Sequence, residues 1–396
     1  MADLSDYEWL TSADAALVLT EVALTDDPVH RQLQRLRKTL SADRARLVVQ
    51  QIELRKRATT KFGDLAAQLF FTDVALQQAT DLWTARYKAG RVSSQQPVVD
   101  YCCGIGGDLL AFAERAPTTG WDRAPEIAHL ANANLRVTQR AAQGNVLVGD
   151  AQAETPSAGE VWHLDPDRRS EGQRSTQLQF HSPGPELVQR WLQQSPNGVL
   201  KLAPATVVPT AWAEQGELEW VTQNRECRQQ IAWFGELATT CGRHRATQLS
   251  ANLAGDCASF VGTPNLRPAL AGQVCRYVFD TNPSIRAAGL TGALAIELDL
   301  QSINDGVSYL TAERPIDHPL LTCFEVIDQL PLRVATLSPQ LRSLHIGRLE
   351  IKKRGVDTDP EQLRKQLKLR GDQWATLLLT RLGASEVALL ARRLRD

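Results

Sequence analysis

A glycine-rich turn, placed between a predicted strand and a predicted helix, is the part of this chain whose residues are best suited to chemistry. Val98, Val99 and Asp100 lead into the turn, and residues 109–113 read as the first turns of a helix. The turn lacks side chains where the backbone bends, at Gly104, Gly106 and Gly107. A helix that begins directly after such a turn offers free N–H groups to a ligand. This stretch therefore predicts a site for a nucleotide-like cofactor.

The spacing of these glycines argues against a dinucleotide cofactor. The dinucleotide fingerprint needs a third glycine three residues after Gly106, and that position holds Leu109. A nicotinamide or flavin dinucleotide is therefore disfavoured. A glycine-rich turn that holds no ligand remains the alternative for this stretch taken alone.

Two further acids follow predicted strands in register with the turn. Asp122 ends a strand and stands eighteen residues after Gly104, where a carboxylate can accept hydrogen bonds from ribose hydroxyls. Asp150 ends the next strand, at residues 145–150, and suits the amino group of an adenine. Either acid alone could simply cap the following helix. Both together, at the carboxyl ends of successive strands, favour a bound adenosine.

A fourth acid ends an apolar strand at residues 160–164, where Asp165 is followed by Pro166. Because proline cannot continue a strand ladder, the strand stops with a carboxylate and an exposed carbonyl at the edge of the sheet. Arg168 and Arg169 come next and could either bind a ligand phosphate or only pair with Asp167.

Lys201 stands inside another apolar strand, at residues 198–204. A lysine is unusual in such a strand. Its amine could reach the predicted site, or its stem could simply carry the charge out to solvent.

The elements that position these residues alternate between strands and helices, after a helical segment at residues 1–92. Short strands expected to finish the sheet lie at residues 217–222, 230–234, 245–249 and 258–261. A connector follows, with a strand at 276–279, a helix at 282–298 and a strand near 307–310. From about residue 315 the pattern restarts as a small α/β module, with strands at 324–327, 345–352, 374–380 and 387–391 and a helix at 361–367. The fold class is therefore α/β.

Charge is concentrated in two basic clusters, because the 44 basic and 45 acidic residues of the whole chain nearly cancel. Residues 31–61 hold ten basic residues against two acids and include Arg55, Lys56 and Arg57. Residues 342–370 hold nine against four and include Lys352, Lys353 and Arg354. Each cluster could be a solvated surface or could contact RNA phosphates.

Targeting signals, membrane spans and metal motifs are not predicted. The N-terminal residues are acidic and precede no apolar run. Seven cysteines without a CxxC pair give neither a disulfide framework nor a zinc site, so Cys241 and His244 are read as structural. We expect a cytoplasmic protein without a metal, and the sequence sets no oligomeric state.

The motifs together resemble those of a bacterial family of class I S-adenosylmethionine-dependent methyltransferases that carry a C-terminal THUMP-like domain. The family is distantly similar to RNA cap guanine-N2 methyltransferases such as trimethylguanosine synthase. The matching segments span most of the chain and lie at residues 100–108, 165–169, 201–204, 233–235 and 346–355. The family usually has a small residue where this chain has Asp167.

The resemblance implies a Rossmann-like methyltransferase domain at residues 95–315, between a helical domain at 1–94 and a THUMP-like RNA-binding module at 316–396. It implies S-adenosylmethionine as the cofactor and RNA as the methyl acceptor, but not the particular RNA or the target atom. Our own expectation is a base nitrogen of tRNA or rRNA. The implied cofactor-binding residues are Asp100, Cys102, Gly104, Gly106, Gly107, Asp108, Asp122 and Asp150. The RNA-binding residues that we expect from the basic clusters and the strand ends are Arg55, Lys56, Arg57, Arg169, Lys201, Lys352, Lys353 and Arg354.

Asp165, Pro166 and Arg168 are the expected catalytic residues. The segment is similar to the D/N-P-P-aromatic motif of amino methyltransferases, whose acid accepts a hydrogen bond from the target N–H. Here Asp167 and Arg168 replace the second proline and the aromatic residue, so Trp162 or the Arg168 guanidinium would have to stack on the base. Two alternatives stay open: an RNA-binding protein whose methyltransferase fold has lost catalysis, and a small-molecule methyltransferase.

Overall fold

The computed structural model describes residues 2–170, 173–250, 257–306 and 309–394. The chain divides into two compact units. Unit 1 takes its described residues from the segments 1–218 and 229–242, and unit 2 takes them from 219–228, 243–250 and 256–396. Each unit is described by itself below.

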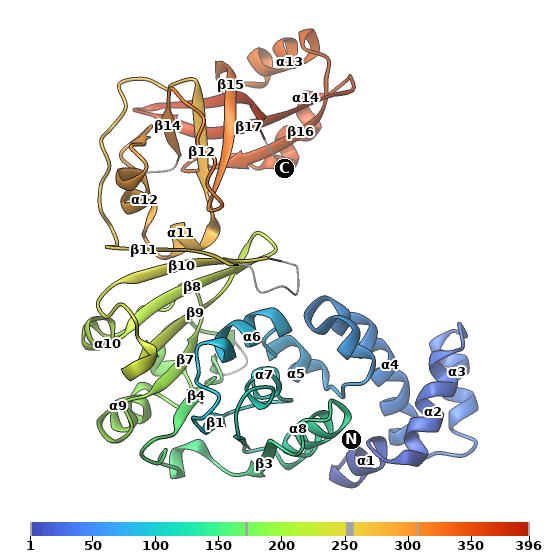
Figure 1. Cartoon of the computed structure of the whole chain (residues 1–396). Coiled ribbons are helices and arrows are strands. Elements are labelled where there is room, and N and C mark those ends of the chain that lie inside the picture. The colour runs from blue at the N-terminus through green and yellow to red at the C-terminus, as the bar shows by residue number, and fades with distance from the viewer. Residues whose placement is uncertain (1, 171–172, 251–256, 307–308, 395–396) are drawn as a thin grey trace. The chain divides into compact units, whose positions relative to one another are not determined.

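The N-terminal part of unit 1 is helical, as the sequence predicts (Figure 1). Its helices are α1 (Leu4–Leu10), α2 (Ala13–Ala23), α3 (Val29–Leu36), α4 (Ala42–Phe62), the 3-10 helix η1 (Gly63–Ala67), α5 (Asp73–Gln78) and α6 (Leu82–Gly90). Ser41 caps α4, since its side chain accepts a hydrogen bond from the backbone N–H of Arg44. Leu19 of α2 and Val48 of α4 belong to the same hydrophobic core as Leu109 after the glycine-rich turn, so these helices and the sheet fold together.

A parallel sheet forms the centre of unit 1. Its strands are β1 (Val98–Tyr101), β2 (Thr118–Asp122), β3 (Gly144–Val148), β4 (Val161–Leu164) and β7 (Gly198–Leu202), and β9 (Glu226–Phe234) pairs antiparallel with β7. The whole nine-stranded sheet has the order β11-β10-β8-β9-β7-β4-β1-β2-β3. The chain runs outward from β1 to β3 on one side and from β4 to β7 on the other, so the order reverses between β1 and β4. Ligands of open α/β sheets bind at such a switch point.

Helices and short turns connect these strands. The helices are α7 (Leu109–Ala113), α8 (Pro125–Val137), α9 (Pro185–Gln194) and α10 (Thr210–Gln215). The short elements are η2 (Ala151–Ala153), η3 (Leu178–Phe180), η4 (Gly235–Leu237) and the paired β5 (Arg169–Ser170) and β6 (Gln173–Arg174).

Aromatic packing fills the core beside β4. The Trp162 ring is fully buried and contacts Trp191 of α9 and Phe234 of β9, with ring centroids 5.6 Å and 5.9 Å away. A Cβ on Gly198 would lie 2.0 Å from the Trp162 ring, so only glycine fits opposite it. Trp162 therefore cannot stack on a substrate base, which corrects one expectation from the sequence.

Unit 2 contains β8 (Glu217–Gln223) from its third residue on, β10 (His244–Leu249) and β11 (Cys257–Gly262), together with a seven-stranded sheet. The order of that sheet is β13-β14-β12-β15-β18-β17-β16. Its strands are β12 (Tyr277–Thr281), β13 (Gln301–Ser302), β14 (Leu310–Ala312), β15 (Leu321–Pro331), β16 (Ile346–Lys353), β17 (Gln373–Leu382) and β18 (Ser385–Arg393). Its helices are α11 (Pro283–Ala287), α12 (Thr291–Glu297), α13 (Val334–Ser343) and α14 (Pro360–Leu367).

Three details of unit 2 differ from the expectation. The single helix expected at residues 282–298 is two helices, because Gly289 takes a φ of +68° between α11 and α12. The strand expected near 307–310 is β14 at Leu310–Ala312, while residues 307–308 lie outside the described residues. Helix α13 was not predicted; it contains Pro339, which usually argues against a helix interior.

Candidate active site at the glycine-rich turn

The glycine-rich turn lies where β1 ends, at the switch point of the sheet (Figure 1). Tyr101 of β1 pairs with Leu164 of β4, so Cys102 and Asp165, the residues that follow these two strands, are neighbours at the same sheet edge. The backbone N–H of Asp165 donates to the carbonyl of Tyr101 at 3.3 Å. The tertiary structure thus brings the turn and the Asp-Pro pair together.

The turn has the conformation that its glycines permit. Gly104 and Gly106 have φ values of +57° and +92°, in the left-handed region that favours glycine. A Cβ on Gly107 would lie 3.0 Å from the backbone of Thr80. A Cβ on Gly104 would meet nothing within 4 Å, so open space lies in front of the turn. Cys102, with a φ of +57°, shares this strained geometry although it carries a side chain.

Asp122 holds the turn from the neighbouring strand. Its two carboxylate oxygens accept hydrogen bonds from the backbone N–H groups of Gly104 and Ala124, each at 3.0 Å. Burial raises the pKa of Asp122, although both hydrogen bonds oppose that shift. Because a carboxylate has about four acceptor positions, Asp122 can bind these N–H groups and still accept from a ligand.

Asp150 lies at the corresponding place after β3. Its side chain is exposed and accepts from the backbone N–H of Gln152 at 2.9 Å. It therefore caps the short helix η2, which is the plainer of the two roles that the sequence allowed, and its exposure leaves acceptor positions open.

A buried ionic network lies behind the turn. Lys88 of α6 is completely buried, and its Nζ lies 2.6 Å from Oδ1 of Asp108. The Thr80 hydroxyl donates to the other oxygen of Asp108 at 2.6 Å. His163 of β4 completes the network, since its Nε2 lies 3.2 Å from Lys88 Nζ and its Nδ1 lies 2.6 Å from Asp100 Oδ1.

Burial and the neighbouring charges shift the pKa values of the two carboxylates in this network in opposite directions. Burial alone would raise the pKa of Asp108, but the positive charges around it, that of Lys88 first, outweigh burial and lower it. Burial raises the pKa of Asp100. Oδ2 of Asp100 is buried and accepts no hydrogen bond from the residues that the structure describes. Asp108 thus serves mainly to anchor the turn, while Asp100 keeps an acceptor unused.

Asp165 forms an ion pair with Lys201 of β7. Nζ of Lys201 lies 2.6 Å from Oδ2 of Asp165 and 3.4 Å from the carbonyl oxygen of Gln78. Burial would lower the pKa of Lys201, but the Asp165 carboxylate outweighs it and raises that pKa, so the amine stays charged. Oδ1 of Asp165 accepts no hydrogen bond from the part of the chain that the structure describes, and this side chain is about one quarter exposed.

The residues after Asp165 turn away from the strand. Pro166 is buried, and Asp167 exchanges two backbone hydrogen bonds of 2.8 Å with Ser182. The side chain of Asp167 accepts from Gln78 at 3.3 Å. Arg168 is half-buried, and the side chain of Arg169 lies outside the described residues.

Several of the basic residues expected to bind RNA form hydrogen bonds or ion pairs within the protein. Arg55 donates to the carbonyls of Leu69 and Gln68, and Arg57 pairs with Asp73 at 2.6 Å. Lys352 and Arg354 both pair with Asp280 of β12. Lys56 and Lys353 are exposed. Lys201, expected to contact RNA, is instead 8% exposed and pairs with Asp165.

Three residues of the site were missed from the sequence. His163 lies two residues before Asp165 and is flanked in β4 by apolar residues. A histidine inside an otherwise apolar strand is a signal that could have been used. Lys88 and Thr80 carried no such signal, because their importance comes from contact with Asp108, 20 or more residues away.

The pieces fit a nucleoside-type cofactor. The open space before Gly104 and the acceptor positions of Asp122 at the next strand lie at one sheet edge, and the unused oxygen of Asp100 is buried within β1. An adenosine with a cationic amino acid tail would supply hydroxyl and ammonium donors to these acceptors.

Comparisons with known proteins agree with this geometry. The chain is 30% identical to an uncharacterized S-adenosylmethionine-dependent methyltransferase of Mycobacterium tuberculosis, from strains CDC 1551 and H37Rv. The similarity extends over 355 residues and covers 87% of this chain and 95% of the relative. The crystal structure of a proposed methyltransferase from Porphyromonas gingivalis W83 superposes with a TM-score of 0.78 at 20% identity, over 97% of this chain and 99% of that one. This likeness confirms the predicted α/β fold.

The C-terminal region matches a family profile described as THUMP domain-like, over residues 321–393. No helix among the described residues is both long and apolar enough to cross a membrane. The relatives from Mycobacterium tuberculosis cover enough of the chain to decide its family. The chain belongs to the S-adenosylmethionine-dependent methyltransferases, and S-adenosylmethionine is its cofactor.

Proposed function

We propose that this enzyme transfers a methyl group to a base nitrogen of RNA, in tRNA or rRNA. The observation that carries the proposal is the placement of Asp165. Its carboxylate stands beside the glycine-rich turn, is partly exposed, and keeps one oxygen that no described residue uses. An acceptor at this place can hold the N–H of a target base next to the transferable methyl.

The cofactor would lie along the carboxyl ends of β1, β2 and β3. Gly104, Gly106 and Gly107 would let its amino acid part approach the backbone, and the free oxygen of Asp100 would accept from its amino group. Asp122 would accept from the ribose hydroxyls and Asp150 from the adenine amine. Cys102 would lie beside the cofactor, and Asp108 would support the turn from behind.

S-adenosylmethionine supplies the methyl group already activated, on a sulfonium. The protein therefore has to orient the nitrogen lone pair and exclude water rather than carry out extensive acid–base chemistry. Oδ1 of Asp165 would accept from the target N–H, and Lys201 would hold the carboxylate in position through its ion pair with Oδ2. Pro166 would hold the backbone carbonyl of Asp165 outside the strand ladder, and Arg168 would lie over the base or its phosphate.

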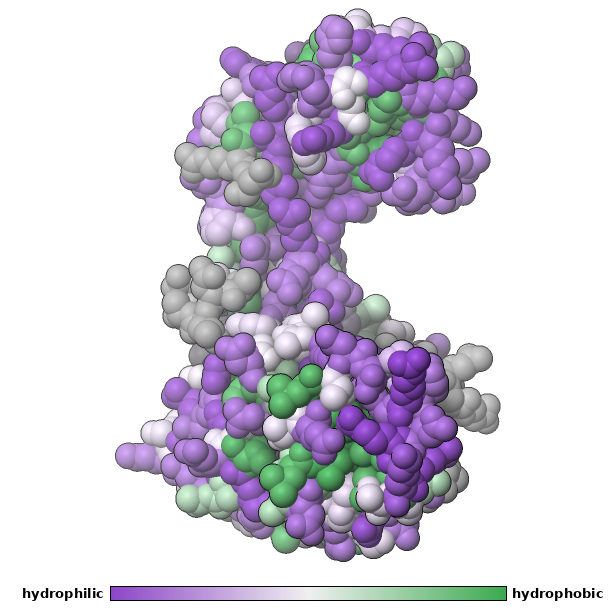
Figure 2. Space-filling model, turned by 90° about the vertical axis from the view of Figure 1, so that its right-hand side faces the viewer, coloured by the Kyte–Doolittle hydropathy of each residue, from purple (hydrophilic) through white to green (hydrophobic). Residues whose placement is uncertain are grey.

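RNA as the substrate is supported by the THUMP-like region, since that profile suggests RNA binding. Lys56 and Lys353 offer exposed cations for phosphates, and the face of unit 2 in Figure 2 is mainly hydrophilic. We keep the division into domains 1–94, 95–315 and 316–396 as part of this proposal, with RNA contacts at Lys56 in the first of them and at Lys353 in the last.

Two other functions compete with this proposal. An RNA-binding protein without catalysis is favoured by Asp167 and Arg168, where amino methyltransferases have a proline and an aromatic residue. A small-molecule methyltransferase would leave the THUMP-like region without a purpose.

Mass spectrometry of nucleosides from RNA of cells with and without this protein tests the proposal. We expect one methylated nucleoside to disappear from tRNA or rRNA without it, and to return on incubation of that RNA with the purified protein and S-adenosylmethionine. Unchanged nucleosides in both RNA classes would refute it. Return of the nucleoside with an Asp165→Asn variant at the normal rate would refute the catalytic assignment alone.

A further inference from the structure

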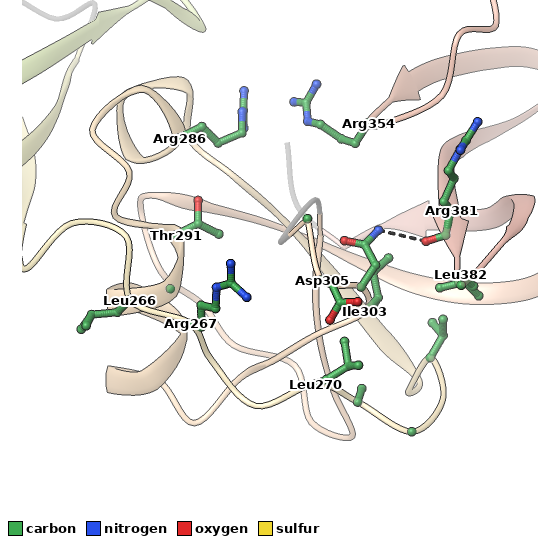
Figure 3. A pocket seen from close by; sticks show the side chains of 18 of the residues that line it. Leu266, Arg267, Leu270, Arg286, Thr291, Ile303, Asp305, Arg354, Arg381 and Leu382 are labelled. Atoms are coloured by element: carbon green, nitrogen blue, oxygen red, sulfur yellow. Dashed lines mark hydrogen bonds between the residues drawn. The ribbon is translucent and has the colours of Figure 1, made fainter. Parts of the chain in front are cut away.

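Unit 2 contains a cavity of about 1000 Å³ that the methyl-transfer site does not explain. Its walls come from residues 265–274, from α11 and α12, from the turn after β13, and from the ends of β16 and β17. Four arginines line it: Arg267, Arg286, Arg354 and Arg381 (Figure 3). Among the described residues that line it, Asp305 is the only one with a carboxylate.

Two of these arginines belong to a cluster with too little negative charge. Arg286 and Arg354 approach each other from facing walls in Figure 3, and each has a nitrogen 3.2 Å from Oδ1 of Asp280. Lys352 lies 3.0 Å from the other oxygen of Asp280. Three cations thus share one carboxylate, which is 5% exposed. Among the described residues, Arg286 and Arg354 have no second carboxylate within ion-pair distance, while Lys352 has Glu350 at 3.9 Å.

Three cations around one carboxylate repel one another, and this repulsion points to an anionic ligand. Burial lowers the pKa of Arg286, and the Arg354 charge lowers it further against the effect of Asp280. The buried Nε of Arg354 donates to no described residue. Partly buried guanidinium groups are stable when an anion neutralises them and accepts their hydrogen bonds.

Arg267 adds a third cation from another wall. In Figure 3 its guanidinium points toward the middle of the cavity, where Asp305 also lies. Arg267 forms no ion pair with any residue in the described part of the chain, whereas Arg381 pairs with Glu386 at 2.8 Å. An anion between Arg267 and the Asp280 cluster would have Asp305 at one side. Asp305 would repel it, whereas the guanidinium groups of Arg267, Arg286 and Arg354 would attract it.

Apolar side chains also line the cavity: Leu266, Leu270, Ile303 and Leu382. In Figure 3 they come from different sides of it, with Leu266 and Leu382 far apart. A bare phosphate ion would use the arginines but would leave these apolar side chains and most of the volume exposed to water. A ligand with a phosphate at one end and a flat apolar ring at the other would use both.

We propose that this cavity binds the terminal phosphate and the base of a nucleotide, either free or at the end of an RNA strand. Arg286, Arg354 and Arg267 bind the phosphate, and the leucine and isoleucine side chains contact the base. The proposal does not depend on which molecule accepts the methyl group, because the cavity lies in unit 2 and the glycine-rich turn lies in unit 1.

Fluorescence anisotropy with the full-length chain tests this inference. The probes are a hexanucleotide RNA with a 5′-phosphate and the same RNA with a 5′-hydroxyl, each labelled at the 3′ end. S-adenosylhomocysteine is present at saturation, so that the cofactor site is filled. We expect the phosphorylated probe to bind at least about tenfold more tightly. Adenosine monophosphate, but not adenosine, should displace the phosphorylated probe if a free nucleotide is sufficient for binding. Neither should displace it if the cavity requires the end of an RNA strand.

Variants separate this cavity from general RNA binding. Arg267→Gln and the double variant Arg267→Gln/Arg381→Gln leave the Asp280 cluster intact and should lose the preference for the 5′-phosphate. Arg314→Gln removes an exposed arginine of unit 2 outside the cavity and should keep it. Thermal unfolding of each protein verifies the fold.

Equal binding of the two probes, with no displacement by adenosine monophosphate, overturns the inference. So does a phosphate preference that survives in the double variant. Because no methyl transfer is measured, this failure is distinct from a failure of the proposed RNA methylation, which nucleoside mass spectrometry reports.

Discussion

The amine of Lys201 lies 2.6 Å from one oxygen of Asp165, and the other oxygen is used by no described residue. The two side chains come from neighbouring parallel strands, β7 and β4, and meet at the edge of the sheet beside the glycine-rich turn. Lys201 therefore holds one oxygen of Asp165 in an ion pair, so the other carboxylate oxygen stays available.

Replacing Asp165 should affect turnover far more than cofactor binding. Asp165→Asn removes the acceptor charge, and we expect single-turnover methylation to fall at least about a hundredfold, or roughly 2.7 kcal/mol of barrier. Affinity for S-adenosylmethionine, measured by calorimetry, should stay within a few-fold. A destabilised variant with near-normal turnover per folded molecule would show that Asp165 only supports the loop.

Lys201 should act through Asp165, as a positioning residue. Lys201→Met should reduce kcat, because the Asp165 carboxylate loses the cation that holds one of its oxygens. Lys201→Arg keeps the charge and should recover part of the rate. Equal rates for the two variants would contradict a positioning role.

Asp122 should contribute directly to cofactor affinity. Asp122→Ala removes the acceptor that we propose for the ribose hydroxyls, and we expect a loss of about 1–3 kcal/mol in the binding of S-adenosylmethionine. Isothermal titration calorimetry measures it, with Asp64→Ala as an exposed control in unit 1. Unchanged affinity in Asp122→Ala would place the ribose elsewhere.

The buried pair of Lys88 and Asp108 should matter mainly for stability. Lys88→Met removes the amine that lies 2.6 Å from Oδ1 of Asp108 and leaves this carboxylate buried without its cation. Breaking a buried pair in this way costs about 3–5 kcal/mol. Urea unfolding should show this loss, whereas Lys56→Met, which changes an exposed lysine, should change stability little. A Lys88→Met variant as stable as the wild type would refute this assignment.

Asp280 should make unit 2 sensitive to acid. Burial would raise the pKa of Asp280, but Arg354, Lys352 and Arg286 outweigh it and lower the pKa. A carboxylate with a lowered pKa in the folded state stabilises the protein above its unfolded pKa of about 3.9, and this stability is lost as the pH falls through the folded value.

The matching experiment compares the wild type with Asp280→Asn. The variant should be less stable at pH 7, and the difference in free energy of unfolding should shrink below about pH 4, where the unfolded carboxyl of the wild type is protonated. Urea denaturation at pH 7 and at about pH 3 measures both values. A difference that grows on acidification would contradict the assignment.

RNA binding should depend on the exposed lysines rather than on the paired arginines. Lys56→Gln and Lys353→Gln should each reduce the slope of log affinity against log salt by about 1. Arg57→Gln serves as the comparison, since Arg57 already pairs with Asp73. A salt-independent affinity would assign both clusters to surface solvation.

Local patterns in the sequence determined the elements around the site and the order in which they occur. Apolar strands, the glycines between β1 and α7, and the proline after Asp165 each act within a few neighbouring residues, so their effects are visible in the chain itself. The α/β fold and the placement of the turn, Asp122 and Asp165 at strand ends follow from them.

The tertiary structure alone decided which charges meet. Asp165 and Lys201 are 36 residues apart, and Asp280 and Lys352 are 72 residues apart. No local pattern encodes such pairs, because strand order and side-chain direction across elements determine them. For the same reason Trp162, which the sequence offered to a substrate base, is buried against Trp191, and the arginines of the unit 2 cavity meet only when β12, α11 and β16 have packed together.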